Sequence, residues 1–361
     1  MTARHIFASG NTARGYFDLY DSVLQNVELV HFLIGGSTFA KSRVIQSVGN
    51  RLEENGIPVE YIHSPMHHEQ LEGLVLQEQG VAIVDVLAPR HWQPRAIGVI
   101  EQYVSISKAF NHLELSKKIN NIRQNNEKMR AAKLKAYDTF AHALRIHDEW
   151  EKYFISNMDF EKANQVTKET ISLLVGYQQV GAKTQAREMF FGAATPSGAV
   201  DFIQKLTEHV PKRYFIKGRP GSGKSTMLKK IVSEATKLGL QVDVYHCGFD
   251  PNSLDMVVLP EKGFAIFDST APHEYFPDRE TDEIIDMYSL TINPGTDEEY
   301  ATQIKEVAER YSKAMKQATA YLKEAQTYFL QNEQIYENCQ NAEQLEAIAE
   351  DITSSILSTV S

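Results

Sequence analysis

Short apolar runs recur along the chain, separated by longer stretches in which apolar residues have helical spacing. Six of these runs have the length of buried strands, at residues 29–34, 59–63, 81–84, 214–216, 242–246 and 264–267. Short apolar runs that alternate with helical stretches are typical of βαβ units, in which neighbouring strands are parallel. The pattern therefore predicts an α/β protein whose parallel sheets are flanked by helices.

Each half of this pattern ends in a long segment without strand signals. Apolar residues follow three-and-four spacing over residues 108–179 and again over 296–357, which predicts helices. Breaks near residues 157–159 and 338–341 indicate a helical hairpin in each half. We expect the apolar stripes to pack against each other and the sheet rather than against a cofactor or a membrane. One stripe consists of Ile304, Val307, Tyr311, Met315, Ala318 and Tyr321.

The two halves are copies of one sequence. When residues 7–90 are placed on residues 190–273, a shift of 183 positions, 22 of 84 positions are identical without a gap. Unrelated chains agree at about one position in twenty, so the match indicates a duplication. We therefore divide the chain into an N-terminal domain, residues 1–183, and a C-terminal domain, residues 184–361.

Composition places the chain among ordinary globular proteins. It has 361 residues, 42% of them hydrophobic, and a formal net charge of -10. The negative charge argues against non-specific binding of nucleic acid, which depends on many Lys and Arg side chains. No run approaches the roughly 18 apolar residues of a membrane span, and the first residues lack a signal-peptide pattern, so we expect a cytoplasmic protein. Cys247 and Cys339 have the spacing of neither a disulfide framework nor a zinc site.

The strongest motif is a phosphate-binding loop in the second half. Residues 218–226 read GRPGSGKST, which satisfies the Walker A pattern between a predicted strand and a predicted helix. The glycines allow backbone N–H groups to surround phosphate oxygens at the positive end of the helix. Lys224 would bridge the β- and γ-phosphates, and the Ser225 hydroxyl would bind Mg²⁺. The expected nucleotide-binding residues are Gly218, Arg219, Pro220, Gly221, Ser222, Gly223, Lys224, Ser225 and Thr226.

A carboxylate for the same metal ion follows another predicted strand. Asp268 has the position of a Walker B aspartate; its alternative role is that of a turn cap. Residue 269 is Ser, so ATPases that polarise water with a Glu directly after this Asp match poorly. His246 ends a strand at the edge where α/β sheets bind ligands, which suggests a catalytic role beside a purely structural alternative. Further candidates for acid, base or metal ligand are Asp250, Asp255 and His273.

The first half carries an altered copy of the loop. Residues 35–42 read GGSTFAKS, so Lys41 and Ser42 are retained, but Ala40 replaces the last glycine and Phe39 stands where the second loop has Ser. A Cβ at a position that takes positive φ, and a ring beside the phosphates, would weaken the cradle. We expect a structural domain that supports its partner. Weak nucleotide binding at Lys41 and Ser42 is the alternative, because Asp85 and His63 persist as counterparts of the strand-end Asp and His.

Other histidines have spacings that do not favour a metal site. His67 and His68 are adjacent in the first half, whereas positions 250 and 251 of the second are Asp and Pro, so we expect solvated loop histidines. His142, His147 and Asp148 belong to the first long helical segment and do not form an i, i+4 ligand pair with one another. We expect solvated or structural roles for these three residues.

The loop at residues 218–226 together with Asp268 resembles the P-loop NTPase superfamily, over the α/β part of each half but not the helical segments. The tandem arrangement, with the segment after His246 and the sequence DSTAPH at 268–273, looks like a bacterial family of tandem P-loop ATPases. The resemblance implies binding of ATP, or another nucleoside triphosphate, with Mg²⁺. Because the superfamily contains kinases, hydrolases, switches and motors, the resemblance selects no single activity.

Two classes of function fit these features. In the first, an enzyme, Mg-ATP at the second loop is hydrolysed or donates its γ-phosphate to a small-molecule acceptor near His246 and Asp250. In the second, a nucleotide-dependent switch with slow hydrolysis, the nucleotide sets the docking of the halves or exposes the helices to a protein partner. The halves could also form an internal pseudo-dimer, with an arginine of the first half completing the second site. Candidates for that arginine are Arg14, Arg90 and Arg95.

Overall fold

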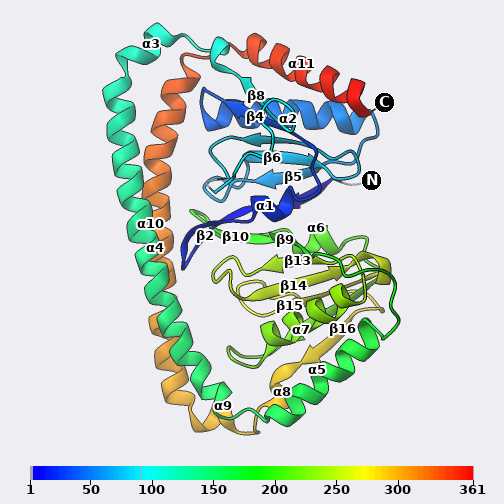
Figure 1. Ribbon diagram of the computed structural model, residues 1–361. Coiled ribbons are helices and arrows are strands. Elements are labelled where there is room, and N and C mark those ends of the chain that lie inside the picture. The colour runs from blue at the N-terminus through cyan, green and yellow to red at the C-terminus, as the bar shows by residue number, and fades with distance from the viewer. Residues whose placement is uncertain (1–2, 90, 361) are drawn as a thin grey trace.

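The computed structural model describes residues 3–89 and 91–360 and contains two α/β lobes that lie on the same side of one pair of long helices (Figure 1). The sheet of the first lobe contains β1 (Arg4–Ile6), β4 (Leu29–Ile34), β5 (Glu60–His63), β6 (Leu71–Leu76), β7 (Val81–Asp85) and β8 (Glu101–Ser105). The sheet of the second lobe contains β9 (Arg187–Phe190), β12 (Lys212–Lys217), β13 (Asp243–His246), β14 (Leu254–Leu259), β15 (Phe264–Asp268) and β16 (Glu283–Asp286). The strand orders are β1-β5-β6-β7-β4-β8 and β16-β12-β15-β14-β13-β9. All six apolar runs predicted as strands form strands.

Both sheets are mixed and mostly parallel, which corrects the expectation of fully parallel sheets. β6 is antiparallel to β5 and β7, and β14 is antiparallel to β13 and β15, whereas the other pairs are parallel. In the first lobe, only residues 64–70 and 77–80 connect β6 to its neighbours. A parallel crossover needs about a dozen residues, so these short connections make hairpins.

Shorter elements complete each lobe in matching positions. Two-stranded hairpins are formed by β2 (Ser9–Thr12) with β3 (Gly15–Asp18) and by β10 (Gly192–Thr195) with β11 (Gly198–Asp201). The helices of the lobes are α1 (Tyr20–Val23), α2 (Thr38–Glu54), α3 (His112–Lys117), α6 (Ile203–Thr207), α7 (Lys224–Lys237), α8 (Met287–Thr291) and α9 (Thr296–Glu299), with 3₁₀ turns η1 (Ser107–Ala109) and η2 (Pro260–Lys262). α2 and α7 each follow a strand that lies inside its sheet, β4 and β12, and so begin at the edge where ligands bind in open α/β sheets.

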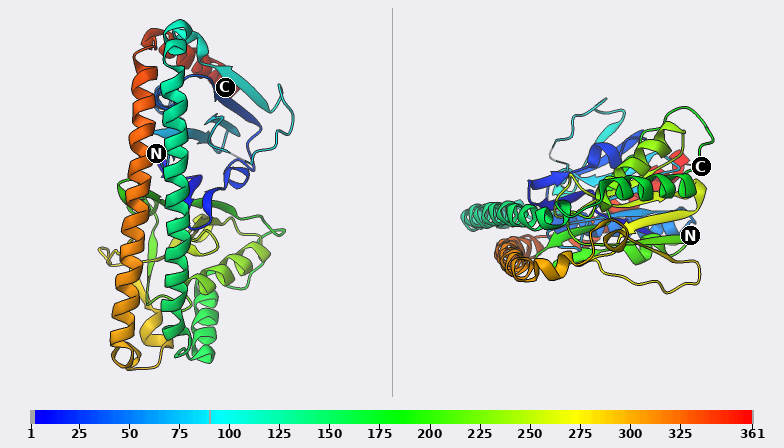
Figure 2. Two further views of the ribbon diagram at one scale, coloured as in Figure 1. Left: turned by 90° about the vertical axis from the view of Figure 1, so that its left-hand side faces the viewer. Right: turned by 90° about the horizontal axis from the view of Figure 1, so that it is seen from below.

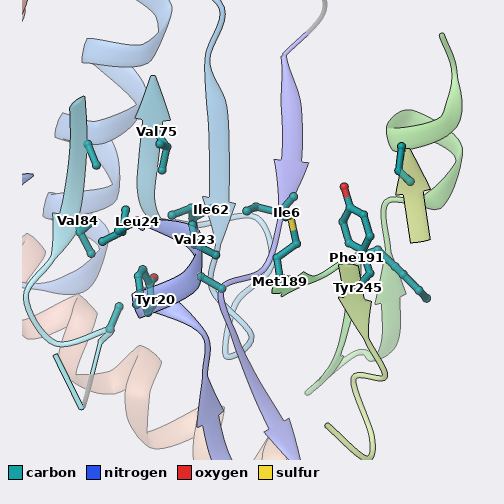
Figure 3. Close-up of a cluster of buried hydrophobic side chains, with 14 of the residues drawn as sticks. Ile6, Tyr20, Val23, Leu24, Ile62, Val75, Val84, Met189, Phe191 and Tyr245 are labelled. Atoms are coloured by element: carbon teal, nitrogen blue, oxygen red, sulfur yellow. The ribbon is translucent and has the colours of Figure 1, made fainter. Parts of the chain in front are cut away.

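The two lobes meet along the outer edges of their sheets. Phe7 and Phe190 form an antiparallel bridge between them, and Arg187 forms a buried ion pair with Glu60 of the other lobe. A cluster of buried side chains from both halves fills the space between the sheets, and it includes Ile6, Val23, Ile62, Met189, Phe191 and Tyr245 (Figure 3). The halves therefore share one core instead of touching only through a linker.

Each half ends in two helices, and the predicted breaks between them are confirmed. The first half contributes α4 (Ile119–Ile155) and α5 (Phe160–Leu174), and the second contributes α10 (Ala301–Glu337) and α11 (Ala342–Val360). α4 and α10 run antiparallel along both lobes (Figures 1 and 2). The predicted hairpins within each half are wrong, because the apolar stripe of α4 packs against α10 of the other half. Contacts in this seam join Ala136, Phe140 and Ala143 to Val307, Ala318 and Leu322.

The terminal helices are exchanged between the lobes. α11, from the second half, packs on α2 of the first lobe, where Ile348 and Ile352 join the same buried cluster as Val44. α5, from the first half, packs on the second lobe, where Leu174 joins the cluster of Met227. Each lobe is thus completed by the helix of the other repeat. Among helices of the described residues, none has both the length and the apolar character that a membrane span requires.

Candidate functional site

The glycine-rich loop of the second lobe lies between β12 and α7, as the sequence predicts. Gly221 and Gly223 have φ values of 76° and 87°, in the left-handed region that favours glycine. Gly223 is the N-cap of α7, and no N-cap side chain accepts a hydrogen bond from the first N–H groups of this helix. The N–H groups of the first turn are therefore available to an anion at the positive end of the helix.

Lys224 and Asp268 lie together beside this loop. Lys224 is the first residue of α7, which follows β12, and β12 is the parallel neighbour of β15, with Ile216 paired to Asp268. The Nζ atom of Lys224 donates a hydrogen bond of 3.0 Å to the carbonyl oxygen of Arg219 and lies 3.6 Å from Oδ2 of Asp268. The Ser225 hydroxyl oxygen accepts a 2.9 Å hydrogen bond from the backbone N–H of Leu254. The structure thus brings the predicted lysine, hydroxyl and carboxylate to one edge of the sheet.

A cavity of about 670 Å³ lies over the loop, within the volume range of small-molecule sites. Every predicted loop residue from Gly218 to Thr226 lines it, as do Asp268, Asp250 and His273. Its opposite wall is formed by α4 and α10, which contribute side chains such as Trp150 and Tyr311. A ligand that fills this cavity would therefore contact both the second lobe and the long helix pair.

The acidic side chains of the cavity include one with a strongly altered pKa. Burial, and next the charge of Asp268, raise the pKa of Asp255 to about 6. A carboxyl group that titrates near neutral pH is suited to take up or release a proton. Asp255 also lines the cavity. Its role as acid or base stays a prediction.

α4 brings three polar residues to the cavity that the sequence did not identify as a group. One ligand atom each from His147, Asp148 and Glu151 lies within 4.8 Å of the others, so the three could hold a metal ion. Burial is the largest cause that lowers the pKa of His147, and burial is also the largest cause that raises the pKa of Glu151. His147, which is half-buried, and Asp148, which is exposed, both line the cavity, and their expected solvated or structural roles stay predictions. His147 and Glu151 are an i, i+4 pair, a signal present in the sequence but overlooked.

His246 is absent from the described residues that line the cavity. Its Nδ1 atom lies 2.6 Å from the carbonyl oxygen of Pro251, and its Nε2 atom lies 3.1 Å from the Glu188 carboxylate. His63 in the first lobe has the same arrangement, with ring contacts to the carbonyl of His68 and to His5. The two histidines therefore hold equivalent loops against equivalent strands, which is the structural alternative considered for His246.

The arginine candidates from the first half have different surroundings. Nε of Arg14 donates a 3.0 Å hydrogen bond to Asp250, so it reaches the rim of the cavity. Arg95 bonds to Glu101 and to the carbonyl of Val27 inside the first lobe. Arg90 lies outside the described residues. Of the two arginines that can be placed, only Arg14 touches a cavity residue.

Histidines and cysteines outside the loop follow the predictions in part. His142 is exposed as expected, but His67 is half-buried and its ring packs against Phe39, because the first loop folds against it. Cys247 and Cys339 are free thiols. Cys247 lines the cavity of the second lobe.

The first lobe repeats the lysine, the hydroxyl and the carboxylate beside its loop, but its lysine is more deeply buried. Lys41 is buried and forms an ion pair with Asp85 at 2.5 Å, with 2% and 4% of the two side chains exposed. The Ser42 hydroxyl accepts from the N–H of Leu71 at 2.8 Å. The lysine that would contact phosphate is therefore neutralised inside the protein, in line with the expectation of a structural domain.

Comparisons of the chain with protein-family models, with curated proteins and with solved structures gave no match. The chemistry of the site therefore has to be inferred from its own residues.

Proposed function

We propose that the second lobe binds a nucleoside triphosphate with Mg²⁺ on the loop of residues 218–226, in the manner of a P-loop protein, and hydrolyses it or transfers its terminal phosphate. The observation that carries the proposal is that Lys224, the first residue of α7, lies 3.6 Å from Asp268 at the end of β15, beside the uncapped start of α7 and on one cavity. Backbone N–H groups at a helix start and a lysine are the donors that polyphosphates require.

The oxygen atoms of Ser225 and Asp268 fit Mg²⁺, which prefers hard oxygen ligands and shares them with substrate phosphates. Oδ2 of Asp268 faces Lys224, and the Ser225 hydroxyl still has a free lone pair after its contact with Leu254. When bound, Mg²⁺ would neutralise charge on the transferring phosphate. The chain's own part is to hold the phosphates with Lys224 and the loop amides.

Two carboxylates of the cavity, besides Asp268, could act as the base in phosphoryl transfer. Asp255 and Glu151 both line the cavity and both have a raised pKa. Either can accept a proton from a water molecule or from an acceptor hydroxyl, which is the task of the base in phosphoryl transfer. Asp250, paired with Arg14, marks the rim where a small-molecule acceptor would enter.

A nucleotide-dependent switch is the second candidate, and one observation favours it. The cavity is walled by α4 and α10, and both helices extend along the two lobes (Figure 2). A nucleotide whose contacts with these helices differ between two arrangements would shift the population toward one of them. In that case turnover is slow, and the readout is a change in the seam between α4 and α10.

Titration calorimetry with Mg-ATP and Mg-GTP, with phosphate release followed in parallel, tests both candidates. We expect one binding site, weakened at least about tenfold by Lys224→Ala, since a hydrogen bond to a charged group contributes about 1.5–3 kcal/mol. Lys237→Ala is the matched control, because Lys237 lies at the far end of the same helix and pairs with Glu234. Equal binding by both variants would contradict the proposal. Fast phosphate release favours the enzyme, and tight binding with slow release favours the switch.

A further inference from the structure

The first loop differs from the second in its backbone as well as in its sequence. Thr38 corresponds to Gly221 in the repeat, yet α2 begins at Thr38 whereas α7 begins only at Lys224. Ala40 stands where Gly223 has a φ of 87°, and none of the described non-glycine residues has a positive φ. The segment that forms a cradle in the second lobe is therefore the first turn of a helix in the first lobe.

The N–H groups of that first turn are occupied by a side chain from α10. Oε1 of Glu333 accepts a 3.1 Å hydrogen bond from the N–H of Thr38, and Oε2 accepts a 3.0 Å hydrogen bond from the N–H of Phe39. The Ser37 hydroxyl accepts from the next N–H, that of Ala40. Glu333 is 6% exposed, so its carboxylate is held out of solvent at the positive end of the helix.

Neighbouring groups close the space around this carboxylate. The Phe39 ring packs edge-on against the rings of His67 and Phe329, and Phe329 belongs to α10 as Glu333 does. Lys41, which could otherwise meet an incoming phosphate, is paired with Asp85. The loop, the lysine and the helix N-terminus thus all have partners from the protein itself.

We infer that Glu333 is a built-in anion that fills the phosphate position of the first loop, so that this lobe is closed to free phosphate compounds and is anchored to α10. A carboxylate and a phosphate use the same donors here, namely backbone N–H groups at a helix start. Because Glu333 is tethered, its effective concentration exceeds that of a free ligand. The inference concerns the first loop and does not depend on the function proposed for the second.

The second lobe brings an equivalent glutamate, Glu151, to its loop, where the carboxylate interacts with the backbone N–H of Gly221 but is less enclosed. Glu151 has the same place in α4 that Glu333 has in α10, since both are 32 residues after the start of helices of 37 residues. A Cβ on Gly221 would lie 2.7 Å from the carbonyl oxygen of Glu151, so α4 approaches the loop closely. The Glu151 side chain is 34% exposed and lines the cavity, whereas Glu333 is enclosed. The repeat therefore carries a glutamate to both loops, and only the first loop has enclosed it.

Anion rescue tests the inference. The experiment compares Glu333→Ala with Glu337→Ala, an exposed α10 residue that pairs with Arg43, both in the Lys224→Ala background so that the second loop contributes little. Thermal unfolding is followed with sodium phosphate and with sodium chloride at equal ionic strength. We expect phosphate to raise the unfolding midpoint of the Glu333 variant by about 2–4 °C more than that of the control.

Two results would overturn the inference: an equal phosphate response in both variants, or a midpoint of the Glu333 variant equal to that of the control without phosphate. Glu333→Gln carries the same test if the alanine variant does not fold, because it keeps the size of the side chain but loses its charge. For that variant we expect a lower midpoint than that of the Lys224→Ala parent and faster amide exchange at residues 38–40. Unchanged exchange there would equally contradict an anion at this loop.

Discussion

Phe7 and Phe190 exchange both of their backbone hydrogen bonds, with N–O distances of 3.0 and 2.9 Å, and they are equivalent positions of the two repeats. A residue that pairs with its own counterpart marks a twofold relation, as in an isologous dimer. The two repeats therefore meet in a local twofold arrangement at this bridge, while an internal pseudo-dimer completed by an arginine stays a prediction.

The buried ion pair between Lys41 and Asp85 gives the first prediction. Lys41→Met leaves the Asp85 charge buried without a partner, and we expect it to lower the free energy of unfolding by about 3–5 kcal/mol. The double variant with Asp85→Asn should recover part of that loss, because no unpaired charge is left. Arg43→Met, in an exposed pair with Glu337, should cost about 1 kcal/mol or less. Urea denaturation measures all three, and a small effect of Lys41→Met alone would show that the pair is solvated.

The exchanged terminal helices give the second prediction. Ile352→Ala removes buried methylene groups from the core that α11 shares with α2, and we expect a loss of about 2–5 kcal/mol. Hydrogen exchange should rise first in α2, which belongs to the other repeat. Leu174→Ala in α5 is the reciprocal variant and should raise exchange in α7. Increased exchange confined to the variant's own repeat would refute the exchange of helices.

The conformation of Gly223 gives the third prediction. At its φ of 87° a Cβ costs about 1–2 kcal/mol, and in Gly223→Ala the loop gains stability by coiling into the helix as residues 38–40 do. We expect nucleotide affinity to fall at least tenfold, measured by calorimetry, which corresponds to about 1.4 kcal/mol or more. Gly56→Ala is the control, since Gly56 has a φ of 77° with open space around it and lies in the other lobe. A loss of affinity in both variants would point to general destabilisation instead.

The fourth prediction concerns pH. Burial raises the pKa of Glu72 from 4.5 to about 7, while its carboxylate oxygen accepts from Ser9 at 3.0 Å. Because the folded state keeps the proton longer than the unfolded chain, the stability contributed is complete below about pH 4.5 and is lost as the pH rises through 7. We expect Glu72→Gln to remove a pH-dependent loss of about 2–4 kcal/mol between pH 5 and 8. The exposed Glu54→Gln is the control, and parallel pH profiles for wild type and Glu72→Gln would rule out a buried acid.

Local patterns in the sequence predicted the local structure. The strand before each loop, the helix after it, and the breaks after Ile155 and Glu337 are all where composition and spacing placed them. Each of these depends on residues that are near one another in the chain. Three-residue edge strands such as β1 were too short to give an apolar run, and so they were missed.

Long-range placement was beyond the reach of the same patterns. The stripe at Val307 and Tyr311 shows that a helix has an apolar face, but a stripe does not identify the surface that covers it. The hairpin prediction failed for this reason. The apolar stripe of α4 packs against α10 of the other half, not against α5. For the same reason the sequence did not identify Glu151 and Glu333 as residues beside the two loops. Their positions follow only from the packing of each long helix against the lobe of the other half.

The exchange of α5 and α11 also constrains how such a protein can have arisen. A single repeat would expose the side of its sheet helix that Leu345, Ile348 and Ile352 cover in the first lobe. Two identical copies could cover each other's surface by trading their last helices, which is the geometry of a domain-swapped homodimer. Gene fusion would then have freed the two halves to diverge, so that one lost its glycine cradle while the other kept it. An ancestor of this kind would be an obligate dimer with two equivalent loops, and the present chain would be its monomeric descendant with one.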